Sequence, residues 1–244
     1  MGFDKLDVVR KLLAKAERAA TAAEAESYTA KAVELSARHG IDAALLAAAR
    51  PGCDEVGTRR IAVDDPYSAG KARLLAWTAA ALRCRAVLHQ ARGGRVTAVT
   101  VLGFAVDRER VELLYTSLLL QAGTQLTAQR PTRPGESVAA YRRSWLHGFA
   151  VQVHRRLLDA ERAAAEQAAG GSPAAGAPTA GSLALVLADR TDRVQRAYAE
   201  AFPALGRARP RALSGSGFAR GAAAGDRADL GGLRVTAAAR PAVG

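Results

Sequence analysis

Arginines interleaved with aromatic residues are the clearest candidates for chemistry in this sequence. Residues 141–145 read Tyr-Arg-Arg-Ser-Trp, and Arg155 and Arg156 follow on the same predicted helix. Guanidinium groups contact phosphates, and aromatic rings stack on bases. An amphipathic helix with a solvated basic face is the competing interpretation. Together with a basic loop further on, the predicted phosphate contacts are Arg142, Arg143, Arg155, Arg156, Arg207, Arg209 and Arg211.

Glycines follow that basic loop. Gly215, Gly217, Gly221 and Gly225 lead into a short predicted helix at residues 218–230. Glycine lets backbone N–H groups approach an anion at a helix N-terminus. The segment lacks the Gly-Lys-Ser/Thr ending of a phosphate-binding loop, so a basic loop beside a closely packed helix is the competing interpretation.

Histidines and carboxylates are the candidates for metal chemistry. His147 and His154 are seven residues apart, about 10.5 Å along a helix, which is too far for both to bind one metal ion directly. Two-metal hydrolysis needs acids that converge, with a lysine close by, and Lys71 is the only lysine after residue 31. We predict no metal and no cofactor, and keep metal-dependent hydrolysis as an alternative function. The paired carboxylates are Asp64–Asp65, Asp189–Asp192 and Asp226–Asp229.

The 244 residues carry a formal net charge of +12. Residues 1–50 hold eight basic and seven acidic side chains, so the excess lies after residue 50. Such a charge favours nucleic acid or another polyanion as the partner. The 30 arginines against 5 lysines, in a chain rich in alanine and glycine, are also typical of GC-rich coding. The leading hypothesis is a non-enzymatic protein that binds nucleic acid or another polyanion.

The cellular compartment is predicted from what the sequence lacks. The two cysteines, Cys53 and Cys84, form neither a disulfide framework nor a metal quartet. The N-terminus has no signal-peptide pattern, and no apolar run reaches about 18 residues. We expect a cytoplasmic protein with reduced thiols and no membrane contact.

The N-terminal residues have the strongest helix signals. Residues 4–19 form a predicted first helix, and Thr21 with Glu24 has the spacing of a capping box for a second. Gly40 is expected to end that helix in a left-handed conformation, with a further helix at residues 43–50. Because the connection before Thr21 is short, the first two helices should form an antiparallel hairpin.

This N-terminal pattern resembles the family called domain of unknown function 2786. In that family, a leucine-lysine-alanine helix precedes a glutamate-alanine-rich helix that ends at a histidine-glycine-isoleucine corner. The resemblance implies a companion domain in the rest of the chain but no activity. The near-neutral residues 1–52 are therefore a candidate docking module for a protein partner. The matching positions are Leu12, Leu13, Lys15, Ala16, Glu24, Ala25, Glu26, Lys31, Ala32, Leu35, His39, Gly40 and Ile41.

The remaining residues, 58–244, predict an α+β domain. An edge strand at 58–63 and a helix at 68–82 precede a hairpin of strands 84–91 and 95–103, with Gly93-Gly94 in its turn. Apolar residues on both faces mark the second hairpin strand as central. The predicted fold class is α+β, with a helical hairpin module at residues 1–52 and a small β-sheet covered by several helices. The later predicted elements are helices 107–129 and 136–168, a flexible linker 169–182, a strand 183–188 in the same sheet, helix 189–202, a last strand at 233–236 and a disordered tail.

Overall fold

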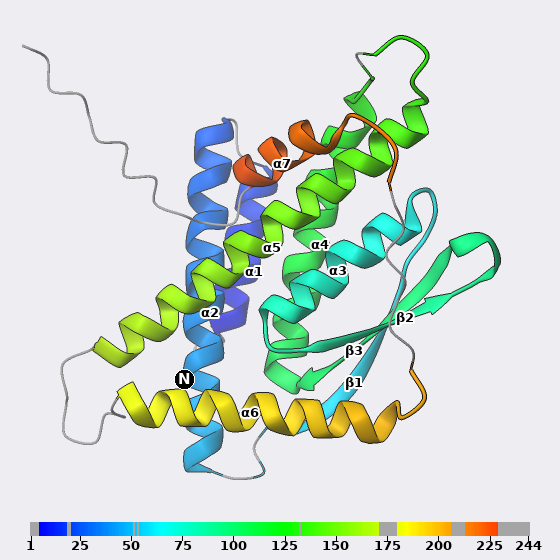
Figure 1. Ribbon diagram of the computed structural model, residues 1–244. Helices are drawn as coiled ribbons and strands as arrows, with labels where there is room; N and C mark the ends of the chain where they lie inside the picture. The colour runs from blue at the N-terminus through cyan, green and yellow to red at the C-terminus, as the bar shows by residue number, and fades with distance from the viewer. Residues whose placement is uncertain are drawn as a thin grey trace, which may run out of the picture.

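The computed structural model describes residues 5–18, 21–50, 52, 54–131, 133–170, 180–205 and 213–228. In these residues, seven α-helices surround a three-stranded antiparallel sheet, which confirms the predicted α+β class (Figure 1). The helices are α1 (Lys5–Glu17), α2 (Ala22–Ala49), α3 (Ser68–Ala81), α4 (Ala105–Ala128), α5 (Val138–Gly170), α6 (Ala180–Ala201) and α7 (Phe218–Arg227). The strands are β1 (Val56–Ala62), β2 (Arg85–Gln90) and β3 (Val96–Phe104).

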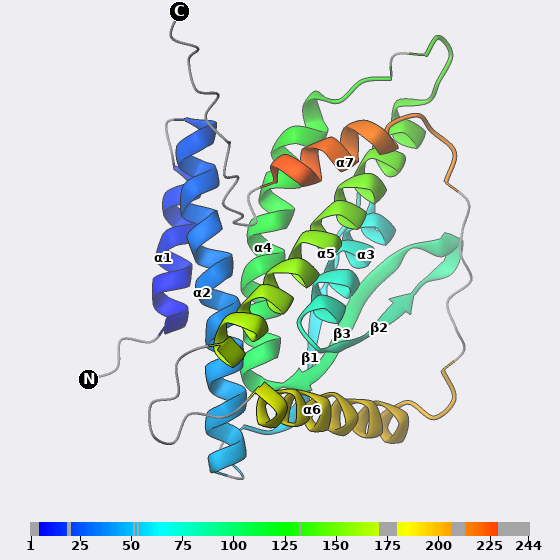
Figure 2. The same ribbon diagram turned by 60° about the vertical axis from the view of Figure 1, so that its left-hand side comes forward.

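Helices α1 and α2 form the predicted helical hairpin and lie side by side at one edge of the molecule (Figure 2). The apolar side of α1 is buried, at Leu6, Val9 and Leu13. The hydroxyl of Thr21 accepts a hydrogen bond from the backbone N–H of Glu24 over 3.1 Å, as the capping box predicts. The Glu24 carboxylate instead accepts a bond from the Tyr28 hydroxyl.

The prediction that Gly40 ends a helix is wrong. Helix α2 runs through this position without interruption and ends at Ala49, so the further helix predicted at residues 43–50 is the last part of α2. Gly40 is needed for space, because a Cβ atom there would lie 2.6 Å from Cζ of Arg110. The glycine lets a buried guanidinium group from α4 approach the helix backbone.

The sheet has the strand order β1-β3-β2, so β3 is central and β1 is an edge strand, as predicted. Strands β2 and β3 form the expected hairpin, and Gly93 and Gly94 adopt φ angles of 77° and 76° in its turn. Glycine is the residue that adopts such positive φ angles readily, so the Gly-Gly pair fixes this turn.

The main hydrophobic core lies between one face of the sheet and helices α3, α4 and α5. Trp145 and Phe149 of α5 are buried in it and stack with their ring centroids 5.4 Å apart. Helix α3 lies between α5 and the sheet, and α7 runs along α5 (Figure 2). Helices α3, α5 and α7 are thus held against one another by one packed core.

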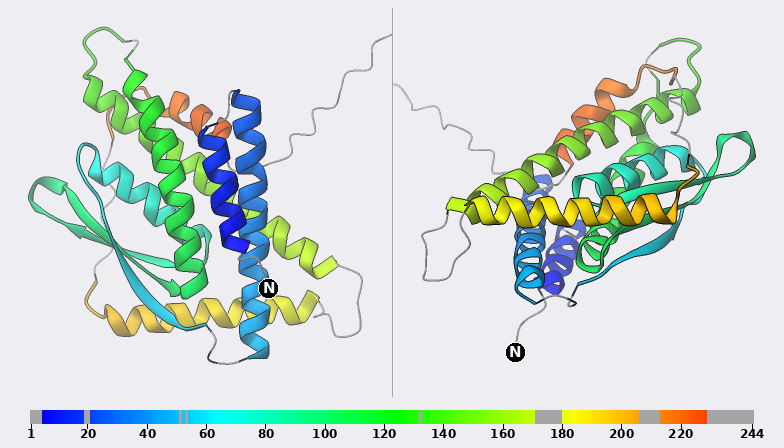
Figure 3. Two further views of the ribbon diagram at one scale, coloured as in Figure 1. Left: turned by 180° about the vertical axis from the view of Figure 1, so that it is seen from behind. Right: turned by 60° about the horizontal axis from the view of Figure 1, so that its bottom comes forward.

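The prediction of a strand at residues 183–188 is also wrong, since these residues begin helix α6. This helix runs across the opposite face of the sheet (Figure 3), where Val194 packs with Leu102 and Phe104 of β3. Leu183, Arg190 and Val194 are buried and lie on one helical face. A short apolar run cannot by itself distinguish a strand from a buried helical turn, and the period of the buried positions here is helical.

The predicted linker at 169–182 is shorter in the structure, because α5 extends to Gly170 and α6 begins at Ala180. Residues 171–179, the predicted strand 233–236 and the predicted disordered tail lie outside the described residues. None of the described helices combines the length and apolar composition that a membrane-spanning segment requires.

Candidate functional site

Two of the arginines predicted to contact phosphate, Arg142 and Arg156, donate hydrogen bonds to backbone carbonyls. Arg142 donates from Nη2 to the carbonyl of Thr127 over 2.7 Å, at the end of α4. Arg156 donates from Nη1 to the carbonyls of Gly225, over 2.9 Å, and Ala228 at the end of α7. Since the last carbonyls of a helix have no intrahelical partner, both arginines cap a neighbouring helix. Their role in phosphate binding stays a prediction, and a phosphate would have to compete with these carbonyls.

The other predicted arginines are either exposed or not described. Arg143 and Arg155 are exposed on α5. They are twelve residues apart, a rotation of about 120° on a helix, so they point to different sides. Arg207, Arg209 and Arg211 lie outside the described residues. Of the four predicted contacts that the structure describes, Arg143 is the one that lines the groove described below.

The glycines of α7 serve close packing, as the competing interpretation held. A Cβ atom on Gly221 would lie 2.6 Å from the carbonyl carbon of Trp145, and one on Gly225 would lie 2.6 Å from the carbonyl oxygen of Phe149. Gly148 of α5 faces α7 in the same way. These glycines therefore allow α5 and α7 to pack backbone to backbone.

A carboxylate of the protein already occupies the start of α7. Glu136 accepts hydrogen bonds from the backbone N–H of Ser216 over 2.6 Å and from its hydroxyl over 2.7 Å. These bonds lower the pKa of Glu136. The anion expected at this helix N-terminus is thus supplied from within the chain.

The two histidines lie on either side of Trp77, a residue of α3. The centroid of the Trp77 ring is 5.5 Å from that of His147 and 5.9 Å from that of His154. His147 also lies 5.5 Å from the ring of Phe218, the first residue of α7. The backbone carbonyl of Trp77 lies 2.9 Å from Nδ1 of His154, which fixes that ring by a hydrogen bond. Both histidines thus belong to a series of aromatic rings.

Arg73 completes this aromatic cluster with a positive charge. One Nη of Arg73 lies 3.2 Å from Nδ1 of His147, and its guanidinium group lies 5.9 Å from the ring centroid of Trp77. Because arginine can only donate, Nδ1 accepts, and a neutral His147 carries its proton on Nε2. Burial and the charge of Arg73 lower the pKa of His147, which favours this neutral form. Burial also lowers the pKa of Arg73 itself, although a guanidinium group stays charged in proteins.

Four residues of this cluster, Arg73, Trp77, His147 and Phe218, line a groove of about 1890 Å³ between α3, the β2–β3 turn, the first half of α5 and residues 213–218. Its walls combine cations with aromatic rings. Arg95 at the turn is paired with Asp65. Among the described residues, neither Arg73 nor Arg143 forms an ion pair. The groove therefore presents uncompensated positive charge beside Trp77, His147 and Phe218.

Sequence reasoning missed Arg73, Trp77 and Phe218 as members of one site. The available signal was helical spacing, because Arg73 and Trp77 are four residues apart and so are Arg143 and His147. Residues at this spacing are neighbours on one helical face. That these two faces look at each other across a groove depends on how α3 and α5 pack.

A second groove, of about 720 Å³, lies between α1, β1 and α4. Two of its three arginines are paired with its two carboxylates, and the third, Arg108, donates to the backbone carbonyls of Gly103 and Thr58. Arg10 lies 3.5 Å from Glu109, and Arg59 lies 3.1 Å from Glu112. Because its carboxylates already neutralise two of its three cations, it is a poorer site for a polyanion than the larger groove.

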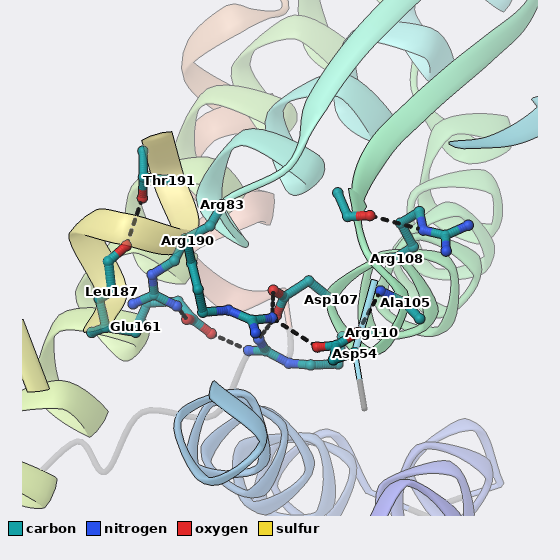
Figure 4. Close-up of polar contacts among 11 residues, drawn as sticks. Asp54, Arg83, Ala105, Asp107, Arg108, Arg110, Glu161, Leu187, Arg190 and Thr191 are labelled. Atoms are coloured by element: carbon teal, nitrogen blue, oxygen red, sulfur yellow. Dashed lines mark hydrogen bonds and ion pairs between the residues drawn. The ribbon is translucent and has the colours of Figure 1, made fainter. Parts of the chain in front are cut away.

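The largest cluster of charges is buried between the N-terminal hairpin and the sheet (Figure 4). Arg110 donates to Asp107 over 2.9 Å and to Glu161, while Arg190 donates to Asp54 over 2.9 Å and to Asp107 over 3.1 Å. With Arg83, which pairs with Glu161, three arginines meet three carboxylates. The cluster is neutral and joins α4, α5, α6 and the segment before β1.

The same cluster reaches the N-terminal hairpin. Nε of Arg110 donates to the Ser36 hydroxyl of α2 over 3.2 Å, and the guanidinium group lies against Gly40. Burial alone would lower the pKa of Arg110, but Glu161 and Asp107 outweigh it and raise the pKa. Burial raises the pKa of the nearby Cys84 thiol, which favours its protonated form at neutral pH.

The predicted carboxylate pairs lie in different parts of the fold. Asp64 and Asp65 precede α3, and Asp189 and Asp192 are exposed on α6. Asp226 accepts a hydrogen bond from Gln152 near the end of α7, and Asp229 lies outside the described residues. Within the part of the chain that the structure describes, no three histidine, cysteine or acidic side chains gather as a metal site would require.

The fold and the groove together define an α+β protein with a cationic, aromatic-lined groove. Residues 5–43 match the family model described as Protein of unknown function (DUF2786). The match covers α1 and most of α2, confirms the resemblance of the N-terminal helical module, and includes Gly40 beside the buried Arg110. The companion domain stays a prediction. Comparisons with curated proteins and with solved structures give no match.

Proposed function

We propose that this protein binds nucleic acid without catalysing a reaction, and that the groove between α3 and α5 is its contact surface. The observation that carries the proposal is the combination of two uncompensated guanidinium groups, Arg73 and Arg143, with aromatic rings in one groove. Phosphates supply the negative charge that such arginines bind, and bases supply flat faces for the rings. The net charge of +12 adds a long-range attraction for the same ligand.

Fluorescence anisotropy with labelled single- and double-stranded DNA and RNA tests this function. We expect binding at about 50 mM salt, where contacts to the nucleic-acid backbone are strongest, and weaker binding as salt rises. Absence of binding to every one of these ligands at this salt concentration would overturn the proposal.

A pair of matched double variants locates the contact surface. Arg73→Gln with Arg143→Gln removes the two groove charges. Arg38→Gln with Arg162→Gln removes two exposed charges outside the groove that pair with carboxylates of their own helices. We expect only the groove variant to lower the slope of log affinity against log salt, by about 1.5 for a single-stranded ligand. Equal effects of the two variants would place binding elsewhere on the surface.

A further inference from the structure

Phe218 is the feature of the groove that charge alone does not explain. It is a large apolar side chain with 41% of its surface exposed, at the edge of a cationic groove. Its ring lies against His147 with a centroid distance of 5.5 Å and an interplanar angle of 57°. An exposed aromatic ring beside unpaired guanidinium groups is the arrangement that a base-stacking surface requires.

The backbone that carries Phe218 is held rigidly. The backbone of Phe218 packs closely against Gly148 of α5. A Cβ atom added to Gly148 would lie 3.0 Å from the carbonyl carbon of Phe218. Gly217 on the preceding position packs equally closely against the backbone of Tyr141 and Trp145. Because α7 is fixed to α5 on both sides of this residue, little ordering of the backbone is needed when a ligand binds.

The neighbouring rings extend the same surface into the groove. Trp77, His147 and Phe218 follow one another with centroid distances of 5.5 Å at each step. Arg73 holds His147 through Nδ1, and Arg143 lies one helical turn before His147 on α5. A nucleotide with its base on Phe218 would thus have cationic side chains within reach of its phosphates.

We propose that the groove selects single-stranded nucleic acid by stacking an unpaired base on Phe218. This inference rests on the proposed function and adds the strand type and the stacking residue to it. In a duplex, both faces of each base are covered by neighbouring bases, and exposing one costs a few kcal/mol. A single strand offers its base faces without that cost.

The test compares three ligands of equal length on the full-length protein: oligo-dT, an abasic oligodeoxynucleotide with the same phosphates, and a DNA duplex. We expect oligo-dT to bind more tightly than the other two. Phe218→Ala should weaken oligo-dT binding by about tenfold and leave abasic binding unchanged. Phe218→Trp should retain the preference, because it keeps an aromatic face.

Leu185→Ala is the matched control, since Leu185 is another exposed apolar side chain, 72% exposed on α6, and lies outside the groove. It should leave all three affinities unchanged, and thermal unfolding should show that both alanine variants are folded. If the three ligands bind equally and Phe218→Ala changes nothing, the stacking inference is overturned while the proposed function stands. If none of them binds, and RNA does not bind either, the proposed function itself fails.

Discussion

Two arginine clusters in this protein have opposite environments. Arg110 and Arg190 are buried between helices, where Asp54, Asp107 and Glu161 accept their hydrogen bonds. Arg73 and Arg143 line an open groove, where Asp65 is paired with Arg95 and no described carboxylate forms an ion pair with either of them. In the first cluster the charge is neutralised within the fold, and in the second no ion pair with a described residue neutralises it.

The difference follows from the cost of burying charge. A guanidinium group that leaves water without a partner is strongly destabilising, so a buried arginine must be paired and hydrogen-bonded. An arginine at a half-open surface keeps part of its hydration and needs no carboxylate. The count of positive charges in the sequence therefore overstates the number available to a polyanion.

The largest loss of stability should come from removing a carboxylate of the buried cluster. Glu161→Ala would leave Arg110 and Arg83 without their shared partner, and Arg110 is fully buried. We expect the free energy of unfolding to fall by about 3–5 kcal/mol, as measured by urea denaturation. Glu166→Ala, an exposed acid on the same helix, is the control and should change it by less than about 0.5 kcal/mol. Equal values for the two variants would show that the cluster does not hold the fold together.

A smaller loss should follow from filling the space beside Arg110. Gly40→Ala would place a methyl group 2.6 Å from Cζ of Arg110 and displace the guanidinium group. We expect a loss of about 1–3 kcal/mol in unfolding free energy, the usual range for overpacking a closely packed site.

Gly123→Ala is the matched control for this substitution. Gly123 is also helical, and nothing lies within 4 Å of its added Cβ atom. Alanine should there stabilise the helix by up to about 1 kcal/mol. If Gly40→Ala were also stabilising, the interpretation of Gly40 as space for Arg110 would be wrong.

Substitution of a groove arginine should show the reverse pattern. It should have little effect on the free energy of unfolding and a clear effect on nucleic-acid binding. Arg143→Gln should change the unfolding free energy by less than about 0.5 kcal/mol, because Arg143 is exposed and outside the core. In anisotropy titrations at several salt concentrations, the slope for single-stranded DNA should fall by about 0.7, the value for one phosphate contact. A folding defect without a change in slope would assign Arg143 to the structure.

The smallest effect concerns His147 and pH. Its pKa lies below the ordinary 6.5, because of burial and then the charge of Arg73. The unfolded chain therefore takes up a proton first as pH falls below about 6.5, so the unfolding free energy declines toward the folded-state pKa.

His147→Gln should make the melting temperature less sensitive between about pH 7.5 and about pH 5.5. Histidine ring NMR on the unsubstituted protein reads the titration directly. A midpoint at or above that of a free histidine would contradict the contact with Arg73.

Local patterns predicted those elements whose signals are short-range. The Gly-Gly turn fixed the β2–β3 hairpin, and Thr21 with Glu24 marked the start of α2, because turns and caps depend on a few adjacent residues. The strand expected at residues 183–188 failed for the opposite reason. Its apolar run suits either a strand or a helix, and only packing against β3 selects the helix.

The candidate site shows the same limit. The aromatic and basic pattern on α5 includes Arg143, which lines the groove, and gives equal weight to Arg142 and Arg156, which cap neighbouring helices. Arg73 and Phe218 lie far from this pattern in the sequence, and the packing of α3 and α7 on α5 brings them to it. The spacing of residues along one helix does not reveal which side chains of a second helix will lie opposite them.

The sequence by itself determined the α+β class, the helical hairpin, the β2–β3 hairpin and an excess of positive charge. Tertiary structure decided which arginines are neutralised and which are exposed, and it gave Gly40 its role. The physical reason is that capping, turn formation and helical period are local properties of the chain. Burial and ion pairing are decided between residues as distant as Asp54 and Arg190, which meet only when the helices pack.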